Sequence, residues 1–148
     1  MDSAMTLSQG ARAALTFQSY EPQPPIDGVF VHRLKVFRGL EGDFMELCRL
    51  REGQIEGLPQ GFEPRQFSLS KAVPGRLNAF HLHPKRPQHE LWCVLEGQLR
   101  VWLVDLRQGS ATEGNRRQVI LSGEEPAFLF VPWGGAHGYQ AGARGAML

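Results

Sequence analysis

The residues best suited to chemistry are three histidines and one glutamate, found in two short stretches of the chain. One stretch reads GRLNAFHLHPKRPQHELWCVLEG and holds His81, His83 and Glu90 at the spacing H-x-H-x6-E. A later stretch, PWGGAH, adds His137. Three imidazoles and one carboxylate directed at one point bind divalent transition metals such as zinc, iron, nickel, copper or manganese. We therefore predict a metal site made of these four residues.

Both stretches have the sequence character of β-strands, which would position the four side chains. Side chains alternate along a strand, so His81 and His83 are expected on the same face. Pro84 and Pro87 then mark a turn, and a hairpin would bring Glu90 back beside the two imidazoles. A single histidine in a strand is more often a hydrogen-bonded polar side chain than a ligand. Four ligand types at consistent spacing favour the metal site over that alternative.

The rest of the chain also favours strands. Gly and Pro, 17 and 10 of the 148 residues, separate short segments in which apolar and polar residues alternate, a pattern typical of strands. Besides the two motif stretches, we expect strands at 29–37, 43–50, 65–71, 98–110, 116–121 and 127–131, with a loop at 51–64. About nine short strands and almost no helix predict an all-β fold, an antiparallel sandwich or small barrel.

Length and charge narrow the domain organisation and the class of partner. The 148 residues suit one domain, which we place at 27–148, after an N-terminal arm at 1–26 with a short helix at 8–15. The net charge of +1 gives no reason to expect nucleic acid or a membrane surface. No apolar run approaches the roughly 20 residues of a membrane span, and no signal peptide is recognisable. We expect a cytoplasmic protein in which Cys48 and Cys93 are free thiols.

The two motifs together resemble the double signature of the cupin β-barrels, with two extra residues before Glu90. The wider chain, from about 28 to 139, resembles the dTDP-4-dehydrorhamnose 3,5-epimerase family. Its strongest match is VDLRQGSATEG, similar to the family's V-D-L/I-R-x-G-S-P-T-F-G, and EGDFMEL, FSLSK, NAFHLH and VPWGGAHGY support it. The resemblance implies a cupin jelly-roll barrel, a homodimer that exchanges N-terminal segments, a small-molecule ligand such as a nucleotide sugar, and no nucleotide or organic cofactor.

The resemblance also assigns roles to individual residues. His81 matches the catalytic base that removes the proton next to a 4-keto group, and imidazole has a pKa suited to that task. His137 matches the second active-site histidine. Phe44 and Glu46 match positions that contact the nucleotide base. The family's Tyr general acid and the carboxylate that orients its catalytic histidine would lie beyond residue 148.

Several family positions are changed. Glu41 and Asn78 stand where the family has arginines that meet the substrate diphosphate, and Pro64 and Gln66 also depart from its pattern. Glu90 replaces the Lys that stabilises the enolate oxygen, which reverses the field on a developing negative charge. The same changes create the metal motif, because the family's Gln becomes His83 and its Lys becomes Glu90. The residues that we expect to line the pocket are Arg65, Gln66, Asn78, Gln88, Trp92 and Trp133.

Three hypotheses follow. The first is a metal-binding cupin enzyme on an epimerase-like scaffold, an isomerase or epimerase with zinc, nickel or manganese, or an oxygenase with iron. The second is a divergent nucleotide-sugar epimerase that uses His81 as the base. The third is a cupin that binds a small ligand without turnover. The losses described above, taken together, predict that the family's own reaction is abolished.

Overall fold

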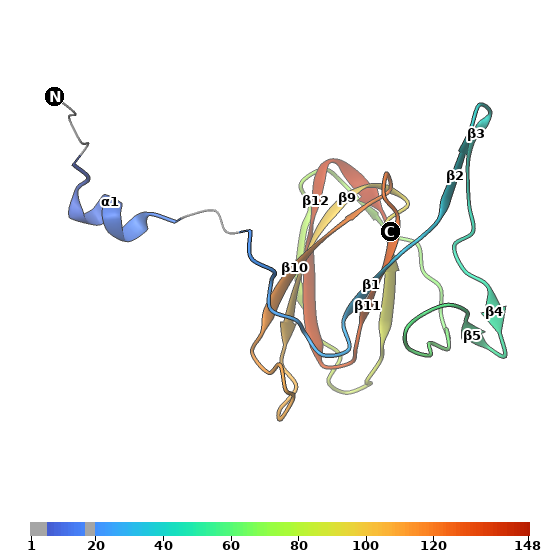
Figure 1. Cartoon of the computed structure of the whole chain (residues 1–148). Helices are drawn as coiled ribbons and strands as arrows, with labels where there is room; N and C mark the ends of the chain where they lie inside the picture. The colour runs from blue at the N-terminus through green and yellow to red at the C-terminus, as the bar shows by residue number, and fades with distance from the viewer. Residues whose placement is uncertain (1–5, 17–19) are drawn as a thin grey trace.

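Two long neighbouring strands, β9 (Glu96–Asp105) and β12 (Gly135–Met147), form the centre of the fold. We analysed a computed structural model that describes residues 6–16 and 20–148 of the chain. β9 and β12 pair antiparallel from Gly135 opposite Asp105 to Met147 opposite Glu96. Their register shifts between Ala141 and Ala146, so β12 bends over the barrel (Figure 1). The prediction of an all-β fold is confirmed.

Two antiparallel sheets face each other across the core. The larger has the order β10 (Arg116–Ser122), β9, β12 and β6 (Lys71–Ala72), and β7 (Leu77–His81) also pairs with β12. The smaller has the order β1 (Phe30–Arg33), β11 (Ala127–Val131) and β8 (Glu90–Cys93). Connections between the sheets place the end of β7 and the start of β8 beside the start of β12.

Alternation along β9 explains where the core lies. Leu99, Val101 and Leu103 point inward with at most 1% of their surface exposed, and Leu129 of β11 meets them from the other sheet at 0%. Burying each such side chain stabilises the fold by about 1.5–3 kcal/mol. The outward positions of β9 are polar or half-buried, as the predicted two-faced strand requires.

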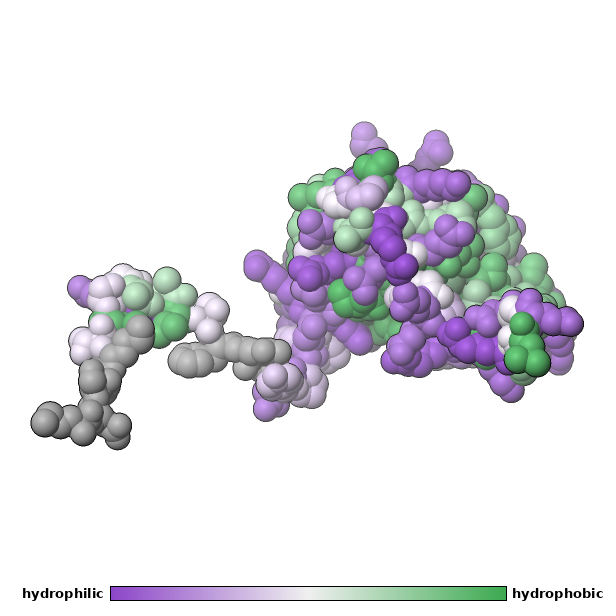
Figure 2. Space-filling model, turned by 90° about the horizontal axis from the view of Figure 1, so that it is seen from above, coloured by the Kyte–Doolittle hydropathy of each residue, from purple (hydrophilic) through white to green (hydrophobic). Residues whose placement is uncertain are grey.

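Two small hairpins stand beside the barrel (Figure 1). They are β2 (Val36–Gly39) with β3 (Gly42–Met45), and β4 (Leu50–Arg51) with β5 (Gln54–Ile55). The β2–β3 hairpin exposes apolar side chains, since Phe37 is 51% and Phe44 64% accessible. Figure 2 likewise shows apolar surface between hydrophilic patches on the main body of the molecule.

The described parts of the N-terminal arm differ in their contact with the barrel. Residues 20–26 lie on it, since Gln23 accepts a hydrogen bond from the backbone of Gln118 and Ile26 is buried in the core, whereas residues 6–16 stand apart from it (Figure 1). The arm's helix α1 (Gln9–Ala14) begins after Ser8, whose Oγ accepts a hydrogen bond from the backbone of Ala11, a regular N-cap. The helix confirms the expectation at 8–15 and buries no residue. Parts of the predicted arm, 1–5 and 17–19, lie outside the described residues. No helix within the described ranges is long and apolar enough to cross a membrane.

Several predicted strand boundaries were wrong. The stretch 29–37 is two strands, because the chain leaves β11 after Arg33, and the strand expected at 43–50 ends at Met45. The expected loop at 51–64 contains β5 and the end of β4. Of 65–71 only Lys71 is in a strand. Alternation indicates which face is apolar but not whether a partner strand is present, and within the described chain only Ser70 of 65–70 exchanges backbone hydrogen bonds, with Leu148.

Candidate functional site

Three strands bring the candidate residues together at one end of the barrel. His81 is the last residue of β7, Glu90 the first of β8, and His137 the third of β12. His137 lies opposite His81 in the β12–β7 pairing, and Glu90 lies opposite Val131. His83 is in the loop after β7. The prediction that His81 and His83 share one strand face was therefore wrong, because the strand ends between them.

His83, Glu90 and His137 form a compact cluster. Their ligand atoms all lie within 4.8 Å of one another. The Nε2 atom of His83 is 2.9 Å from Oε1 of Glu90, and Nε2 of His137 is 3.6 Å from Oε2. The side chains of the three are 42%, 18% and 5% exposed, so the cluster opens to solvent on the His83 side and is closed on the His137 side.

Neutral donors hold the Glu90 carboxylate in place. Gln88 Nε2 donates to Oε1 at 3.0 Å, and Trp92 Nε1 donates to Oε2 at 2.7 Å. Burial works to raise the pKa of Glu90, but the Gln88 hydrogen bond, the nearby His137 and the Trp92 hydrogen bond outweigh it and lower the pKa. The carboxylate is therefore ionised and fixed. Gln88 and Trp92, both predicted to line the pocket, contact it directly.

The orientation of His137 places a lone pair against this carboxylate. Its Nδ1 lies 3.2 Å from the carbonyl oxygen of Gly135, and a carbonyl only accepts, so Nδ1 carries the proton. Neutral His137 then points the Nε2 lone pair at Glu90. Burial lowers the pKa of His137 despite the opposing effect of Glu90. A positive species between the two side chains would remove the repulsion between these electron-rich atoms.

His81 stands apart from the cluster. Its Nε2 is 2.7 Å from Oδ1 of Asn78, so with an amide oxygen as acceptor Nε2 carries the proton and Nδ1 the lone pair. The rings of His81 and His137 are nearly parallel, with centroids 6.1 Å apart, yet no ligand atom of His81 belongs to the group of three. The structure thus brings together three of the four predicted ligands and gives Asn78 the role of holding the fourth.

The residues predicted to contact a nucleotide base lie on the projecting hairpin. Phe44 is in β3 and packs against Phe37 at a ring-centroid distance of 6.2 Å. Glu46 directly follows β3 and pairs with Arg49 at 2.6 Å. That hairpin stands off the barrel (Figure 1), so one chain by itself does not bring these two residues to the cluster.

The remaining predicted pocket residues are exposed or engaged elsewhere. Arg65 pairs with Glu63 at 2.9 Å, and its side chain is 81% exposed. Gln66 donates to Ser68 at 2.9 Å. Trp133 is 52% exposed on the turn before β12. The structure gives none of these three a contact with the cluster within the part of the chain that it describes.

The donor set of the cluster fits a transition metal. Two imidazole nitrogens and one carboxylate, with room for further ligands on the exposed side, match catalytic zinc sites and also suit iron, nickel or manganese. Ligating carboxylates in metalloproteins are usually held by outer hydrogen bonds. The Trp92 and Gln88 contacts to Glu90 provide that support.

Sequence reasoning missed one polar group beside the site. Asp105 is 0% exposed and accepts a hydrogen bond from Arg107 Nε at 2.9 Å. Hydrogen bonds from Arg107 hold the pKa of this carboxyl well below its usual range. A signal was present, since Asp105 continues the inward face of β9 after Leu103. A carboxylate in an apolar face needs a buried partner.

Comparisons with known proteins agree with this architecture. The family model for dTDP-4-dehydrorhamnose 3,5-epimerase matches residues 23–148. The chain is 38% identical over 115 residues to the spore coat polysaccharide biosynthesis protein SpsL of Bacillus subtilis, covering 78% of this chain and 71% of SpsL. It is 34% identical over 116 residues to the dTDP-4-dehydrorhamnose 3,5-epimerase of Methanothermobacter thermautotrophicus, spanning 78% of this chain but 62% of that enzyme.

Solved structures show the same fold. The epimerase RmlC from Legionella pneumophila, crystallised with dTDP-4-keto-L-rhamnose, superposes with a TM-score of 0.71 at 29% identity, covering 84% of this chain and 66% of that one. A dTDP sugar isomerase from Desulfovibrio desulfuricans gives a TM-score of 0.68 at 25% identity, over 82% of this chain and 74% of that one. The predicted cupin-type barrel is therefore confirmed.

Proposed function

The chain belongs to the dTDP-4-dehydrorhamnose 3,5-epimerase family, and we propose that it is a divergent, metal-binding member that moves a proton next to a carbonyl of a carbohydrate. His83, Glu90 and His137 would hold a divalent transition metal, and His81 would be the base. One observation carries this proposal: three ligand atoms gather within 4.8 Å, while Asn78 holds the fourth candidate apart at 2.7 Å.

The cluster supports a metal because its three possible ligand atoms lie within 4.8 Å of one another. His137 directs the Nε2 lone pair at Glu90 when Nδ1 donates to Gly135. His83 places its Nε2 2.9 Å from Oε1 of the same carboxylate, where it donates its proton in the absence of a metal and would give that proton up to bind one. A divalent metal would supply a positive charge that polarises a carbonyl oxygen and stabilises the negative charge left when a neighbouring proton departs.

Asn78 prepares His81 for proton transfer. Because its amide oxygen accepts from Nε2–H, the His81 ring presents Nδ1 as the basic atom. The ring centroids of His81 and His137 are 6.1 Å apart, so a substrate at the cluster would lie within reach of that base. An imidazole in this position can remove the proton from one face of a carbon next to a carbonyl, and epimerisation is completed when a separate acid or a water molecule delivers a proton to the opposite face.

The departures from the family fit the same proposal. Glu90 occupies the place of the family's enolate-stabilising Lys and by itself would oppose a developing negative charge. With a divalent ion bound, the net local charge becomes positive again. Glu41 and Asn78 lack the positive charge of the arginines they replace, which predicts weak binding of a nucleotide diphosphate and slow or absent turnover of the family's dTDP-sugar.

A second copy of the chain would complete the surroundings of the site. Phe44 and Glu46 lie on a hairpin that does not reach the cluster of its own chain, and this hairpin exposes Phe37 and Phe44. Exposed apolar surface of this kind marks protein interfaces. We propose a homodimer, and light scattering after size exclusion tests it. A monomer at micromolar concentration would contradict it.

Metal content of untagged protein tests the central proposal. Near-stoichiometric zinc, iron, nickel or manganese is expected in the wild type and should be lost in His83→Ala and Glu90→Ala. Glu96→Ala is the matched control, because Glu96 is also a glutamate that opens a strand but lies outside the cluster. Protein that binds no metal after supplementation would reject the metal and leave Glu90 and the histidines as an acid–base group.

Solvent proton exchange tests the reaction class. In heavy water, a 4-keto-6-deoxy sugar free of nucleotide should exchange its proton next to the carbonyl with metal-loaded wild type. The rate should fall at least about 100-fold in His81→Ala, the usual contribution of a positioned base. Exchange that is unchanged in His81→Ala would remove His81 as the base. No exchange with that sugar or with its dTDP derivative would favour a cupin that only binds its ligand.

A further inference from the structure

Asp105 is the most heavily bonded side chain near the site. Its Oδ1 accepts hydrogen bonds from the backbone and the Nε of Arg107, at 3.1 and 2.9 Å. Its Oδ2 accepts from Arg107 Nη2 at 2.9 Å and from the hydroxyls of Ser110 and Thr112 at 2.7 Å each. Five donors on one buried carboxylate fix it, and they fix the Arg107 guanidinium that meets it with two nitrogens.

The pinned Arg107 side chain lies against the turn that leads to His137. A Cβ built on Gly134 would come within 2.5 Å of Arg107 Cγ, so the arginine stem covers the α-carbon of this residue. Gly134 also has a φ of +79°, which a side chain would strain. Because the guanidinium is held by Asp105, the stem cannot swing aside without breaking several hydrogen bonds.

The next residue carries the contact to His137. Gly135 lies opposite Asp105 in the β12–β9 pairing, and its N–H closes the turn on the carbonyl of Pro132 at 3.1 Å. Its own carbonyl accepts from Nδ1 of His137. The Asp105–Arg107 pair thus bounds the same short turn from two sides, through the stem on Gly134 and through the strand pairing at Gly135.

We infer that Asp105 and Arg107 are positioning residues, which hold the Gly134–Gly135 turn so that its carbonyl keeps His137 in the Nδ1–H form with Nε2 facing Glu90. This inference deepens the proposed function and rests on it for its consequence, since a misplaced His137 would weaken metal binding. The same guanidinium also donates to the carbonyl of Asp27 at 2.7 Å, so it joins the start of the barrel domain to this turn.

Arg107→Ala and Gly134→Ala each disrupt the contact between the Arg107 stem and Gly134, one by removing the stem and the other by adding a methyl group beneath it. Each should weaken Zn²⁺ or Co²⁺ binding by about 10–100-fold, the range for residues that orient a metal ligand. The double variant should lose less than the product of the two single losses, because the added methyl no longer meets the arginine stem. Multiplicative losses would show that the two residues act independently and would overturn the inference.

Two milder variants distinguish a specific loss of metal affinity from a general loss of structure. Arg107→Lys keeps the stem over Gly134 and should recover part of the affinity lost in Arg107→Ala. Arg100→Ala, which removes an exposed arginine of β9, should bind metal as the wild type does. If Arg107→Ala lowers only the melting temperature and leaves metal affinity unchanged, the pair has a structural role alone and the inference fails.

A second readout separates this inference from the proposed function. Ring-nitrogen chemical shifts of His137 in metal-free protein report which nitrogen carries the proton. The wild type should show Nδ1–H, whereas Arg107→Ala and Gly134→Ala should show a mixture of the two tautomers. Wild type without metal binding but with this shift pattern would reject the proposed metal and support the positioning role. A pure Nδ1–H tautomer in both variants would overturn the role.

Discussion

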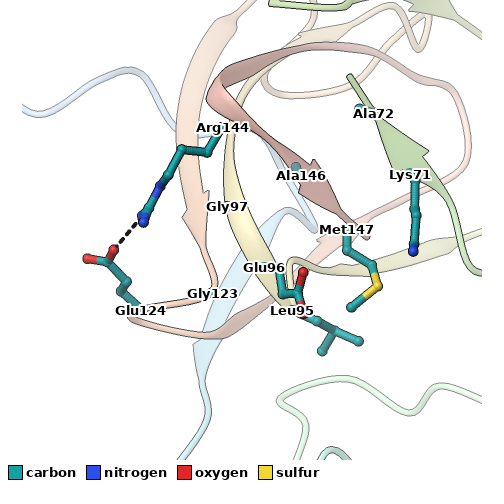
Figure 3. Close-up of a pocket in the computed structure, with 10 residues that line it drawn as sticks. All are labelled: Lys71, Ala72, Leu95, Glu96, Gly97, Gly123, Glu124, Arg144, Ala146 and Met147. Atoms are coloured by element: carbon teal, nitrogen blue, oxygen red, sulfur yellow. Dashed lines mark hydrogen bonds and ion pairs between the residues drawn. The ribbon is translucent and has the colours of Figure 1, made fainter. Parts of the chain in front are cut away.

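Strand β12 has a polar cluster near its beginning and a wide pocket near its end, and the two regions hold their charges differently. The pocket has a volume of about 540 Å³ and is lined by charged residues including Lys71, Glu96, Glu124 and Arg144 (Figure 3). Its Glu124–Arg144 pair is 2.7 Å apart, but both side chains are more than three quarters exposed. At the other end, Glu90 is 18% exposed and both of its oxygens have fixed neutral donors.

The two regions differ in how firmly their charged side chains are held. Exposed ion pairs contribute only about 0.2–1 kcal/mol, because water competes for both partners and their geometry is soft. Partly buried groups with fixed hydrogen bonds keep their direction, which a metal site and a proton transfer both need. The pocket therefore lacks the feature that makes the cluster a candidate site, which is a set of ligand atoms held close to one point.

Glu90→Gln should have the largest effect of all the substitutions, because it removes the negative charge from the cluster. The amide has the size of the carboxylate but lacks its charge and places an NH₂ group toward one of the histidines. Metal affinity should fall by at least about 1,000-fold, more than the 10–100-fold of residues that only orient a ligand. Isothermal titration with Zn²⁺ measures this, and Glu96→Gln in the pocket is the control. Equal affinity in both variants would place the metal elsewhere.

Gly97→Ala should cause the largest effect at the other end, and on stability rather than on metal binding. A Cβ there would overlap the backbone carbonyl of Gly145, and φ is +71°. Since backbone cannot yield as a side chain does, the variant should lose about 3 kcal/mol of unfolding free energy. Gly75 has φ +72° in open space, so Gly75→Ala should lose only about 1 kcal/mol. Equal losses in urea denaturation would refute the overlap.

The barrel could be predicted from sequence because its strands pair within the chain. The alternation on β9 correctly places Leu99, Val101 and Leu103 inward, and the apolar run of β11 is buried throughout. The stretch 65–70 has a similar alternation, yet Phe67 is 74% exposed and only Ser70 finds a backbone partner among the described residues. Patterns report the faces of a strand, and pairing depends on the rest of the fold.

The site was predictable in its residue types but not in its division of roles. Spacing identified His81, His83, Glu90 and His137 as one group, and three of them do meet. What the sequence could not show is that β7 ends at His81, so that His83 reaches the cluster from a loop. The hydrogen bond from Asn78 that sets His81 apart depends on side-chain directions that no spacing determines.

The stability contributed by the buried Asp105–Arg107 pair should depend on pH. The pKa of Asp105 is lowered in the folded state, mainly by Arg107, so its full contribution to stability is present above the unfolded pKa of about 3.9 and decreases progressively as the pH falls from there toward the lower folded-state pKa. Asp105→Asn should be about 2 kcal/mol less stable at pH 7, and the gap should shrink toward pH 3. A gap that stays constant between pH 7 and pH 3 would contradict this.

Trp92→Phe should show how much the hydrogen bond from Trp92 to Glu90 contributes to metal binding. Phenylalanine keeps an aromatic ring beside His137 but removes the Nε1–H that donates to Oε2 at 2.7 Å. Metal affinity should fall about 10-fold, the lower end for an outer-shell partner, with a minor change in melting temperature. Trp102→Phe, on the outer face of β9, is the matched control. A loss as large as that of Glu90→Gln would mean that Trp92 does more than orient the carboxylate.

Arg144→Ala should have the smallest effect, because the Glu124–Arg144 pair is exposed on both sides. The unfolding free energy should change by less than about 0.5 kcal/mol, and 1 M salt should remove even that, since it shortens the screening length to about 3 Å. Metal affinity should stay at the wild-type value, because the pocket and the cluster lie near opposite ends of β12. A several-fold change in affinity would show that the two ends are coupled along the strand, and the contrast between them would then be one of degree.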